Sequence, residues 1–313
     1  MIKLVLMLAT LMSIPLLWGC ASQEVKFSSV STKVFDDGSF NIKHSALLPS
    51  GDTLTYPEVR VYWQWLEFKS SDSQTVSARL IRPIASNVDA SKLMCFVGGY
   101  RIVPNSLFGI ALQVAASGHP SLVLIPRGYD INSTLPYSYG VKEVEDLTYA
   151  LTLYMQVFKT DSLRLNLYTS SSGFNVVLAA LAGSKNIIVN AAIVESPIPD
   201  LAKAMAKDVP EHITSAIRAD LASGTSTIED FNLSRLLTTR SIQSALVVRG
   251  SKDEIVTDAE FDEVLTQIRR SVRNTDTLAS ACSQHNIRQV VPCNTSDIRT
   301  IDARVMQWLT TKW

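Results

Sequence analysis

Short apolar runs alternate with amphipathic stretches beyond residue 92, and this rhythm constrains the fold more than any other feature of the chain. Six runs are rich in aliphatic and β-branched residues, as strands buried on both faces are. They span residues 93–97, 122–125, 163–168, 191–194, 245–248 and 287–291. Between them, residues 107–116, 141–158, 173–181 and 259–272 carry apolar side chains at helical spacing. The alternation predicts an α/β fold in which helices cover both faces of a mostly parallel sheet.

The segment before residue 92 has a different pattern. Residues 59–68 have the period-two alternation of a strand, with Val61, Trp63 and Trp65 on one face and Tyr62, Gln64 and Leu66 on the other. Residues 76–81 follow a polar turn and are the expected partner strand. Residues 21–55 are rich in serine and threonine, with a turn at residues 36–38 between short β-like runs. We therefore expect a tether and a hairpin over residues 20–55, followed by the α/β domain over residues 56–313.

Residues 200–244 interrupt the strand–helix rhythm. Two helical stretches, near residues 200–207 and 211–222, are followed by a Ser/Thr-rich link. Asp200 follows two prolines and is suited to cap the first of these helices. The segment is interpreted as a small helical cap inserted above the carboxyl edge of the sheet.

The first twenty residues have the layout of a secretory signal. Lys3 is followed by an apolar stretch too short to span a bilayer, which ends in Leu17-Trp18-Gly19-Cys20. This ending resembles the lipobox of bacterial lipoproteins, which implies cleavage after Gly19 and lipidation of Cys20. Ala21, in place of aspartate, implies sorting to the outer membrane, facing the periplasm. The alternative is an ordinary signal peptide, residues 1–19, beside an incidental cysteine.

Composition excludes several classes of function. The 29 basic and 29 acidic residues cancel, so the chain lacks the basic surface that a nucleic-acid partner requires. Neither a dinucleotide-binding glycine motif, nor a phosphate-binding loop of the Walker type, nor the paired histidines of a metalloprotease occurs. We expect no cofactor and no catalytic metal.

The most informative segment is residues 165–182, LNLYTSSSGFNVVLAALA. An apolar strand leads through Thr169-Ser170-Ser171-Ser172-Gly173 into a helix, a turn of small residues around a central serine. Such a turn lifts the hydroxyl of Ser171 above the sheet, and the amide of Ser172 at the helix start can serve an oxyanion. The alternative is a serine-rich helix cap without chemistry. Arg164 and Asn166, on the other face of this strand, are unusually polar for an internal parallel strand.

The segment resembles the nucleophile elbow of the α/β-hydrolase superfamily, nearest to its serine esterase and peptidase branches. Gly98-Gly99-Tyr100 follows the first strand of the sheet, where that family has its oxyanion loop. The resemblance implies backbone donors at Gly99 or Tyr100, together with Ser172. Residues 247–256, VVRGSKDEIV, resemble the family's turn that carries the triad acid, which implies that role for Asp253.

The base of the triad is less clearly marked. Of the four histidines, only His285 follows Asp253, as the family's order requires. His44 falls in the N-terminal hairpin and is expected to lie outside the core of the fold. His119 falls in a helix-to-strand turn at the wrong end of the sheet, and His212 at a cap helix. If residues 287–291 form the last strand, His285 precedes it and cannot reach Ser171. The base role requires instead that the weakly apolar residues 276–281 form that strand; otherwise His285 is structural or lies on the surface.

The four cysteines divide by context. Cys95 lies in an apolar run and is expected to be a buried free thiol, whereas Cys20 belongs to the lipobox. Cys282 and Cys293 are close in sequence, and an oxidising compartment favours a disulfide between them. With His285 they could alternatively supply three zinc ligands, but no fourth ligand is evident.

These features predict a lipid-anchored serine hydrolase that cleaves an ester, a thioester or a small peptide bond, with esterase chemistry favoured over peptidase chemistry. Ser171 is the expected nucleophile, Asp253 the orienting acid and His285 the candidate base. Two alternatives remain open. One is a binding protein of the same fold that lacks the histidine; the other is an acyltransferase that uses the same residues.

Overall fold

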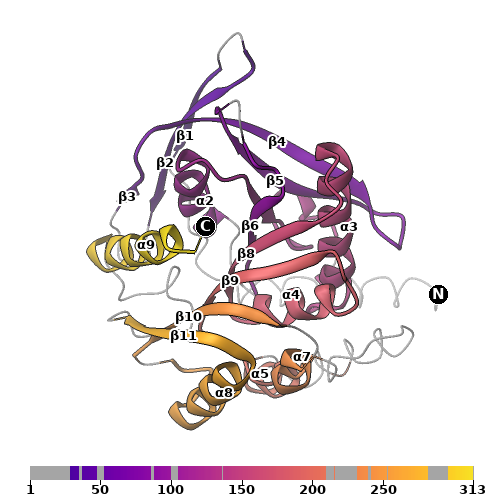
Figure 1. Ribbon diagram of the computed structural model, residues 1–313, viewed down its shortest axis with the longest axis vertical. Coiled ribbons are helices and arrows are strands. Elements are labelled where there is room, and N and C mark those ends of the chain that lie inside the picture. Colours follow the sequence, from indigo (N-terminus) through magenta and orange to yellow (C-terminus); the bar gives the residue numbers. More distant parts are fainter. Residues whose placement is uncertain are drawn as a thin grey trace, which may run out of the picture.

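The structure, a computed structural model, describes residues 29–34, 37–47, 53–85, 88–99, 105–135, 137–208, 215, 231–238, 241–251, 253–280 and 295–312. These residues form one eleven-stranded sheet with helices on both faces (Figure 1). Its strand order is β1-β2-β4-β5-β7-β6-β8-β9-β10-β11, and β3 pairs with β2 beside this row. The bounds are β1 Ser29–Val34, β2 Phe40–Leu47, β3 Thr53–Thr55, β4 Val59–Lys69, β5 Thr75–Pro83, β6 Lys92–Val97, β7 Ser121–Leu124, β8 Leu163–Ser170, β9 Ile187–Glu195, β10 Ile242–Gly250 and β11 Val272–Ser280.

The row divides into an antiparallel part and a parallel part. The pairings among β1, β2, β3, β4, β5 and β7 are antiparallel. From β7 through β6, β8, β9 and β10 to β11, all neighbours run parallel. The predicted parallel sheet is confirmed, and so is the predicted pairing of residues 59–68 with residues 76–81.

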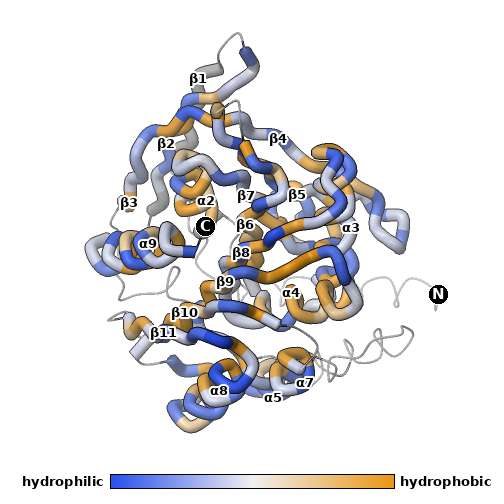
Figure 2. The backbone as a smooth tube through the Cα atoms, in the orientation of Figure 1, coloured by the Kyte–Doolittle hydropathy of each residue, from blue (hydrophilic) through white to orange (hydrophobic). Residues whose placement is uncertain are grey.

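Helices cover both faces of the parallel part. The apolar cluster on one face includes α2 (Asn105–Ala116) and α9 (Thr295–Thr310). The cluster on the other face includes α3 (Val141–Phe158), α4 (Gly173–Leu181) and α8 (Asp258–Ser271). Figure 2 shows apolar central strands between helices whose residues alternate between hydrophobic and hydrophilic. α3, α8 and α9 turn apolar stripes to the sheet, as the helical spacing predicted, whereas α2 and α4 are buried on nearly all sides.

The last described strand differs from the one that the apolar runs favoured. β11 lies parallel to β10 at the end of the row, and only Val272 and Ser280 among its residues are buried. A strand this exposed shows neither a continuous apolar run nor a clear alternation, which explains why residues 272–280 gave a weak signal. The expected strand at residues 287–291 lies outside the described residues.

The N-terminal hairpin extends the same sheet, because β2 pairs with β4. His44 on β2 is buried, stacked against Tyr56 with ring centroids 5.5 Å apart, and it meets the edge of Phe108 from α2. The expectation that His44 lies outside the core is therefore wrong. α2 packs against this part of the sheet and encloses the ring.

A buried ion pair connects the turn between β4 and β5 with helix α3. Arg127, which follows β7, donates to both carboxylate oxygens of Asp146 at 2.8 and 3.0 Å. The same guanidinium pairs with Asp72 of the turn, and the Ser70 hydroxyl donates to Asp146 at 2.6 Å. Asp146 is thus buried in this ion pair, and the helical pattern of residues 141–158 could not show the distant cation.

Two short helices, α5 (Leu201–Asp208) and α7 (Leu233–Leu237), are the helices described within residues 200–244. The Asp200 carboxylate accepts a hydrogen bond from the amide of Lys203 at 3.0 Å, as expected of a residue that caps α5. α7 contacts α4 and α8. None of the described helices is long and apolar enough to cross a membrane.

Candidate active site

The predicted elbow forms at the junction of β8 and α4. β8 ends at Ser170, α4 begins at Gly173, and Ser171 between them adopts the left-handed backbone conformation with φ of +55°. This conformation costs a non-glycine residue energy, and it persists where surrounding contacts enforce it. One such contact is the hydrogen bond that the Ser171 amide donates to the Glu195 carbonyl of β9, at 2.8 Å.

The small residues around Ser171 are required by close backbone approaches. A Cβ atom at Gly173 would lie 2.3 Å from the carbonyl oxygen of Val97 in β6, so a larger residue could not fit there. Thr169 stands where the related motif has its first glycine, and its side chain is fully buried. Its hydroxyl donates to the Ile193 carbonyl at 3.1 Å, so the neighbouring strand satisfies the extra polar atom.

Gly99 lies directly against the start of α4. A Cβ atom at Gly99 would lie 2.7 Å from the Ser172 amide nitrogen and 2.6 Å from the Ser172 hydroxyl oxygen. The absence of a side chain at Gly99 therefore keeps the space beside this amide open. Ser172 is the N-cap residue of α4, and the helix dipole favours negative charge at this end of the helix. Tyr100, the other expected donor, lies outside the described residues.

Tyr137 is a feature of the site that the sequence did not single out. It shares a side-chain hydrogen bond with Ser172, and its ring meets those of Tyr129 and Tyr139. Burial, together with the nearby Glu143 carboxylate, raises the pKa of Tyr137 well above its usual value, so the hydroxyl stays protonated. Only the cluster of tyrosines ahead of α3 could have signalled this position.

Asp253 follows β10, at the same edge of the sheet as Ser171. Its Oδ1 accepts hydrogen bonds from the amides of Ile255 and Val256, both at 2.9 Å, which fixes the carboxylate within its turn. β9 lies between β8 and β10, so roughly 10 Å of sheet separates the ends of the two strands. This separation suits an acid that acts on Ser171 through an intervening side chain.

Glu195 adds a buried carboxylate beside the elbow. It is the register partner of Ser170, and its Oε1 accepts a hydrogen bond from the Tyr168 hydroxyl at 2.5 Å. The Tyr168 ring in turn stacks on Phe96 of β6, with centroids 5.6 Å apart. These contacts link the ends of β6, β8 and β9, so Glu195 supports the elbow through both its backbone and its side chain.

Several expected residues lie outside the described ones: Cys20, Cys282, His285, Cys293 and His212. Within the described part, Cys95 is a buried free thiol, as expected, and burial raises its pKa to about 12. His119 lies between α2 and β7, at the amino edge of the sheet and away from the elbow. No group of potential metal ligands occurs among the described residues.

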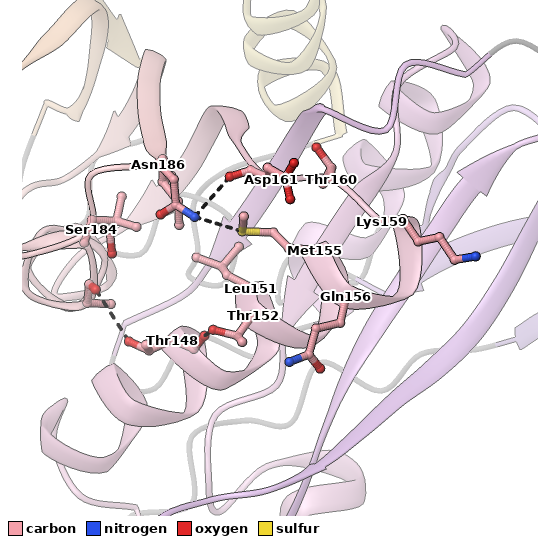
Figure 3. A pocket seen from close by; sticks show the side chains of 13 residues that line it. Thr148, Leu151, Thr152, Met155, Gln156, Lys159, Thr160, Asp161, Ser184 and Asn186 are labelled. Atoms are coloured by element: carbon pink, nitrogen blue, oxygen red, sulfur yellow. Dashed lines mark hydrogen bonds between the residues drawn. The ribbon is translucent and has the colours of Figure 1, made fainter.

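A cavity of about 440 Å³ lies elsewhere, between the ends of α3 and α4 (Figure 3). Its lining includes Thr160 and Asp161, which precede β8, and Asn186, which precedes β9. Asn186 crosses it to donate to the Asp161 carbonyl at 3.2 Å. The cavity is thus at the amino edge of the sheet, opposite Ser171, and it does not contribute to the candidate active site.

The strand order, the crossover helices and the elbow together define an α/β-hydrolase fold, and comparison with solved structures agrees. An esterase of Pyrococcus furiosus superposes with a TM-score of 0.58 over 80% of this chain and 92% of its own, at 18% identity. An acylaminoacyl peptidase of Pyrococcus horikoshii superposes with a TM-score of 0.61 over 87% of this chain, at 12% identity.

A dipeptidyl peptidase 4 of Porphyromonas gingivalis also superposes, with a TM-score of 0.56 over 91% of this chain, at 14% identity. The chain spans about half the length of these two peptidases, 48% and 50%, but most of the esterase. No protein-family model and no curated protein matches the sequence. At these identities the likeness concerns the fold, and the function has to be argued from the site.

Proposed function

We propose that this protein is a serine hydrolase that cleaves an ester, a thioester or a small amide bond, with Ser171 as the nucleophile. The observation that carries the proposal is the strained backbone of Ser171 between β8 and α4, with the Ser172 amide and the bare Cα of Gly99 beside it. A cap without chemistry needs neither the left-handed serine nor an open space before the following amide.

The reaction follows from this geometry. The Ser171 hydroxyl attacks the acyl carbon while a base takes its proton, and the resulting oxyanion is held by the amides of Ser172 and of Gly99 or Tyr100. When the oxyanion collapses, the leaving group departs with the proton from the base and the acyl group stays on Ser171. Water, activated by the same base, then releases the acid and restores the serine.

His285 is the proposed base, and the position of β11 supports it. β11 ends at Ser280, the register partner of Gly250 at the carboxyl edge. His285 follows five residues later, and five extended residues span up to about 17 Å. β11 lies three strands from β8, roughly 14 Å at the usual strand spacing. The chain is therefore long enough to bring an imidazole to Ser171, and Asp253 on the intervening loop would orient it.

The anchoring of the protein is a separate part of the proposal. The lipobox-like ending at Cys20 supports lipidation of that residue, and Ala21 supports an outer-membrane location facing the periplasm. A disulfide between Cys282 and Cys293 would suit this oxidising compartment. The substrate is accordingly a small acyl or peptide compound of the cell envelope.

Labelling with a serine-reactive phosphonate probe tests the nucleophile. We expect the purified protein to be labelled and Ser171→Ala to remain unlabelled. Ser196→Ala is the matched control, because Ser196 also has a positive φ and directly follows the neighbouring strand β9. Its labelling should equal that of the native protein. Equal labelling of Ser171→Ala would reject Ser171 as the nucleophile, and absence of labelling in all three proteins would favour a binding protein without hydrolase activity.

The base is tested on an activated ester. We expect His285→Ala to lower turnover by about a thousandfold or more, since the members of a triad act as a unit. His119→Ala, at the opposite edge of the sheet, should leave turnover unchanged. Unchanged turnover in His285→Ala would reject the histidine assignment and leave that of Ser171 intact. Adding alcohol acceptors separates hydrolysis from acyl transfer, because only a transferase gives a new ester as its main product.

A further inference from the structure

A second cavity, of about 170 Å³, lies at the amino edge of the sheet, on the face that α9 covers. It is lined by Lys92 of β6, Arg164 and Asn166 of β8, Asn190 of β9, and Lys312 just beyond α9. Lys92 and Arg164 are register partners on adjacent strands, so their side chains start from neighbouring positions. Ser171 is at the other end of β8, so this cavity is separate from the candidate active site.

The lining carries three positive charges, and among the described residues only Asp89 pairs with one of them. Lys92 forms an exposed ion pair with Asp89, at 3.4 Å. Within the described part of the chain, Arg164 and Lys312 have no carboxylate partner; the Lys312 ammonium lies 5.2 Å from the centre of the Trp308 ring. A cavity with this excess of cations attracts an anion.

A buried amide supplies the second observation. Asn166 is 1% exposed, and its Nδ2 has no hydrogen-bond partner among the described residues. Its Oδ1 accepts a hydrogen bond from Asn190 Nδ2 at 3.1 Å, and the same nitrogen donates to the Lys312 carbonyl at 2.5 Å. This network fixes the Asn166 amide, and no acceptor for its N–H donors lies within the described part of the chain. A buried donor of this kind is rare unless something binds to it.

We propose that this cavity binds a small oxyanion of the phosphate type, either free phosphate or a phosphomonoester group. The guanidinium of Arg164 offers paired N–H donors that match two phosphate oxygens. The ammonium groups of Lys92 and Lys312 add charge, and the Asn166 amide donates to a further oxygen. The volume of about 170 Å³ is sufficient for one such group.

The proposal also accounts for an anomaly in the sequence of β8. Arg164 and Asn166 lie on the face of an internal parallel strand, where apolar residues are the rule. Both residues line the cavity, whereas the alternate positions Leu163, Leu165 and Leu167 belong to the opposite apolar cluster. The polar side chains are thus concentrated where an anion would meet them.

Calorimetric titration with inorganic phosphate, in chloride buffer of matched ionic strength, tests the site. We expect saturable binding to the native protein, weakened by about tenfold or more in Arg164→Gln because a charge-assisted pair of hydrogen bonds is lost. Asn166→Leu, of similar volume, should weaken it as well. Arg269→Gln on the exposed face of α8 is the control and should bind as the native protein does.

Arg164 is exposed, so Arg164→Gln should keep the fold, which its melting temperature checks. Absence of saturable binding to the native protein, or equal binding to Arg164→Gln, would overturn the proposal. Vesicles containing phosphatidic acid distinguish the two sources. Binding of these vesicles that Arg164→Gln abolishes assigns the site to a lipid headgroup, and binding of phosphate alone assigns it to a soluble ligand. Neither result depends on whether Ser171 is a nucleophile.

Discussion

At the scale of single residues, the geometry of the candidate site depends on two glycines, which have no Cβ atom. Gly173 and Gly99 lack the Cβ atoms that would collide with β6 and with the Ser172 amide, respectively. The first absence lets the strand and helix approach closely enough to hold Ser171 in its left-handed conformation. The second keeps the proposed oxyanion position open. The two glycines therefore have different roles, and substitutions should separate them.

Gly99→Ala should abolish most of the hydrolysis of an activated ester and lower the melting temperature, because the new Cβ atom would lie 2.7 Å from the Ser172 amide nitrogen and 2.9 Å from the Ser170 carbonyl oxygen. The new methyl group would occupy the space beside the Ser172 amide, and loss of one oxyanion donor costs about a hundredfold or more in kcat. Gly183→Ala is the control, because a Cβ atom there meets nothing within 4 Å. Kinetics and melting temperatures of both variants provide the measurement. Native activity in Gly99→Ala would exclude this amide from the oxyanion site.

His44 is expected to make the protein sensitive to mild acid. Burial, and then the charge of Arg79, lower the pKa of His44 to about 4, whereas the unfolded chain takes up this proton near pH 6.5. The stability that depends on neutral His44 is fully present above about pH 6.5, and it is lost as the pH falls towards 4. For this 1% exposed side chain the loss amounts to about 3 kcal/mol.

His44→Phe removes this titration and keeps a ring between Tyr56 and Phe108. Denaturant unfolding at pH 7 and pH 5 should show a smaller fall in the free energy of unfolding for the variant than for the native protein. Carboxylates titrate equally in both proteins, so the difference between them isolates His44. Equal falls would show that His44 is not the source.

At the scale of the elements, the strand–turn–helix of the elbow was the part most open to prediction. The bounds of α3 and α4 agree with residues 141–158 and 173–181; α3 has one buried stripe, and α4 is an apolar helix that follows directly on the serine turn. β11 was the hardest, since an exposed strand at the end of the sheet has no apolar pattern of its own. Its neighbour β10 supplies the pairing that defines it.

Asp146→Ala should destabilise the junction of α3 with the β4–β5 turn by about 3 kcal/mol or more, because it leaves Arg127 buried without its main partner. The double variant Arg127→Met, Asp146→Leu should recover much of this loss. Glu145→Ala, which breaks an exposed ion pair with Lys142, should cost less than about 1 kcal/mol. The measurement is the free energy of unfolding of each variant in denaturant. A small loss in Asp146→Ala would contradict a structural role for the ion pair between Arg127 and Asp146.

At the scale of the whole molecule, the sheet brings together residues that lie far apart in sequence. Gly99, Ser171 and Asp253 follow β6, β8 and β10, and parallel strands place all three turns at one edge. The cations of the second cavity gather at the opposite edge in the same way. One sheet thus holds two separate candidate sites, one at each edge, and only the first could be predicted from motifs.

Cys20→Ser tests the proposed anchoring of the whole molecule. In bacterial cells the native protein should incorporate labelled fatty acid and sediment with the membranes, because several acyl chains on one residue hold a protein stably in a bilayer. The variant should lose the label and leave the membrane fraction. Cys95→Ser is a suitable control, since Cys95 is buried in the core and should not affect labelling. Membrane attachment of unlabelled Cys20→Ser would require another anchor.

The sequence by itself determined the α/β alternation, the elbow around Ser171 and the turn that holds Asp253, because each depends on a local pattern of apolar and small residues. Only the tertiary structure decided that residues 272–280 complete the sheet, that His44 and Asp146 are buried, and that Tyr137 lies beside Ser172. The physical reason is the same in each case. The spacing of apolar residues shows which face of a segment is buried. It does not show the partner of a buried polar side chain, because that partner comes from a distant part of the chain.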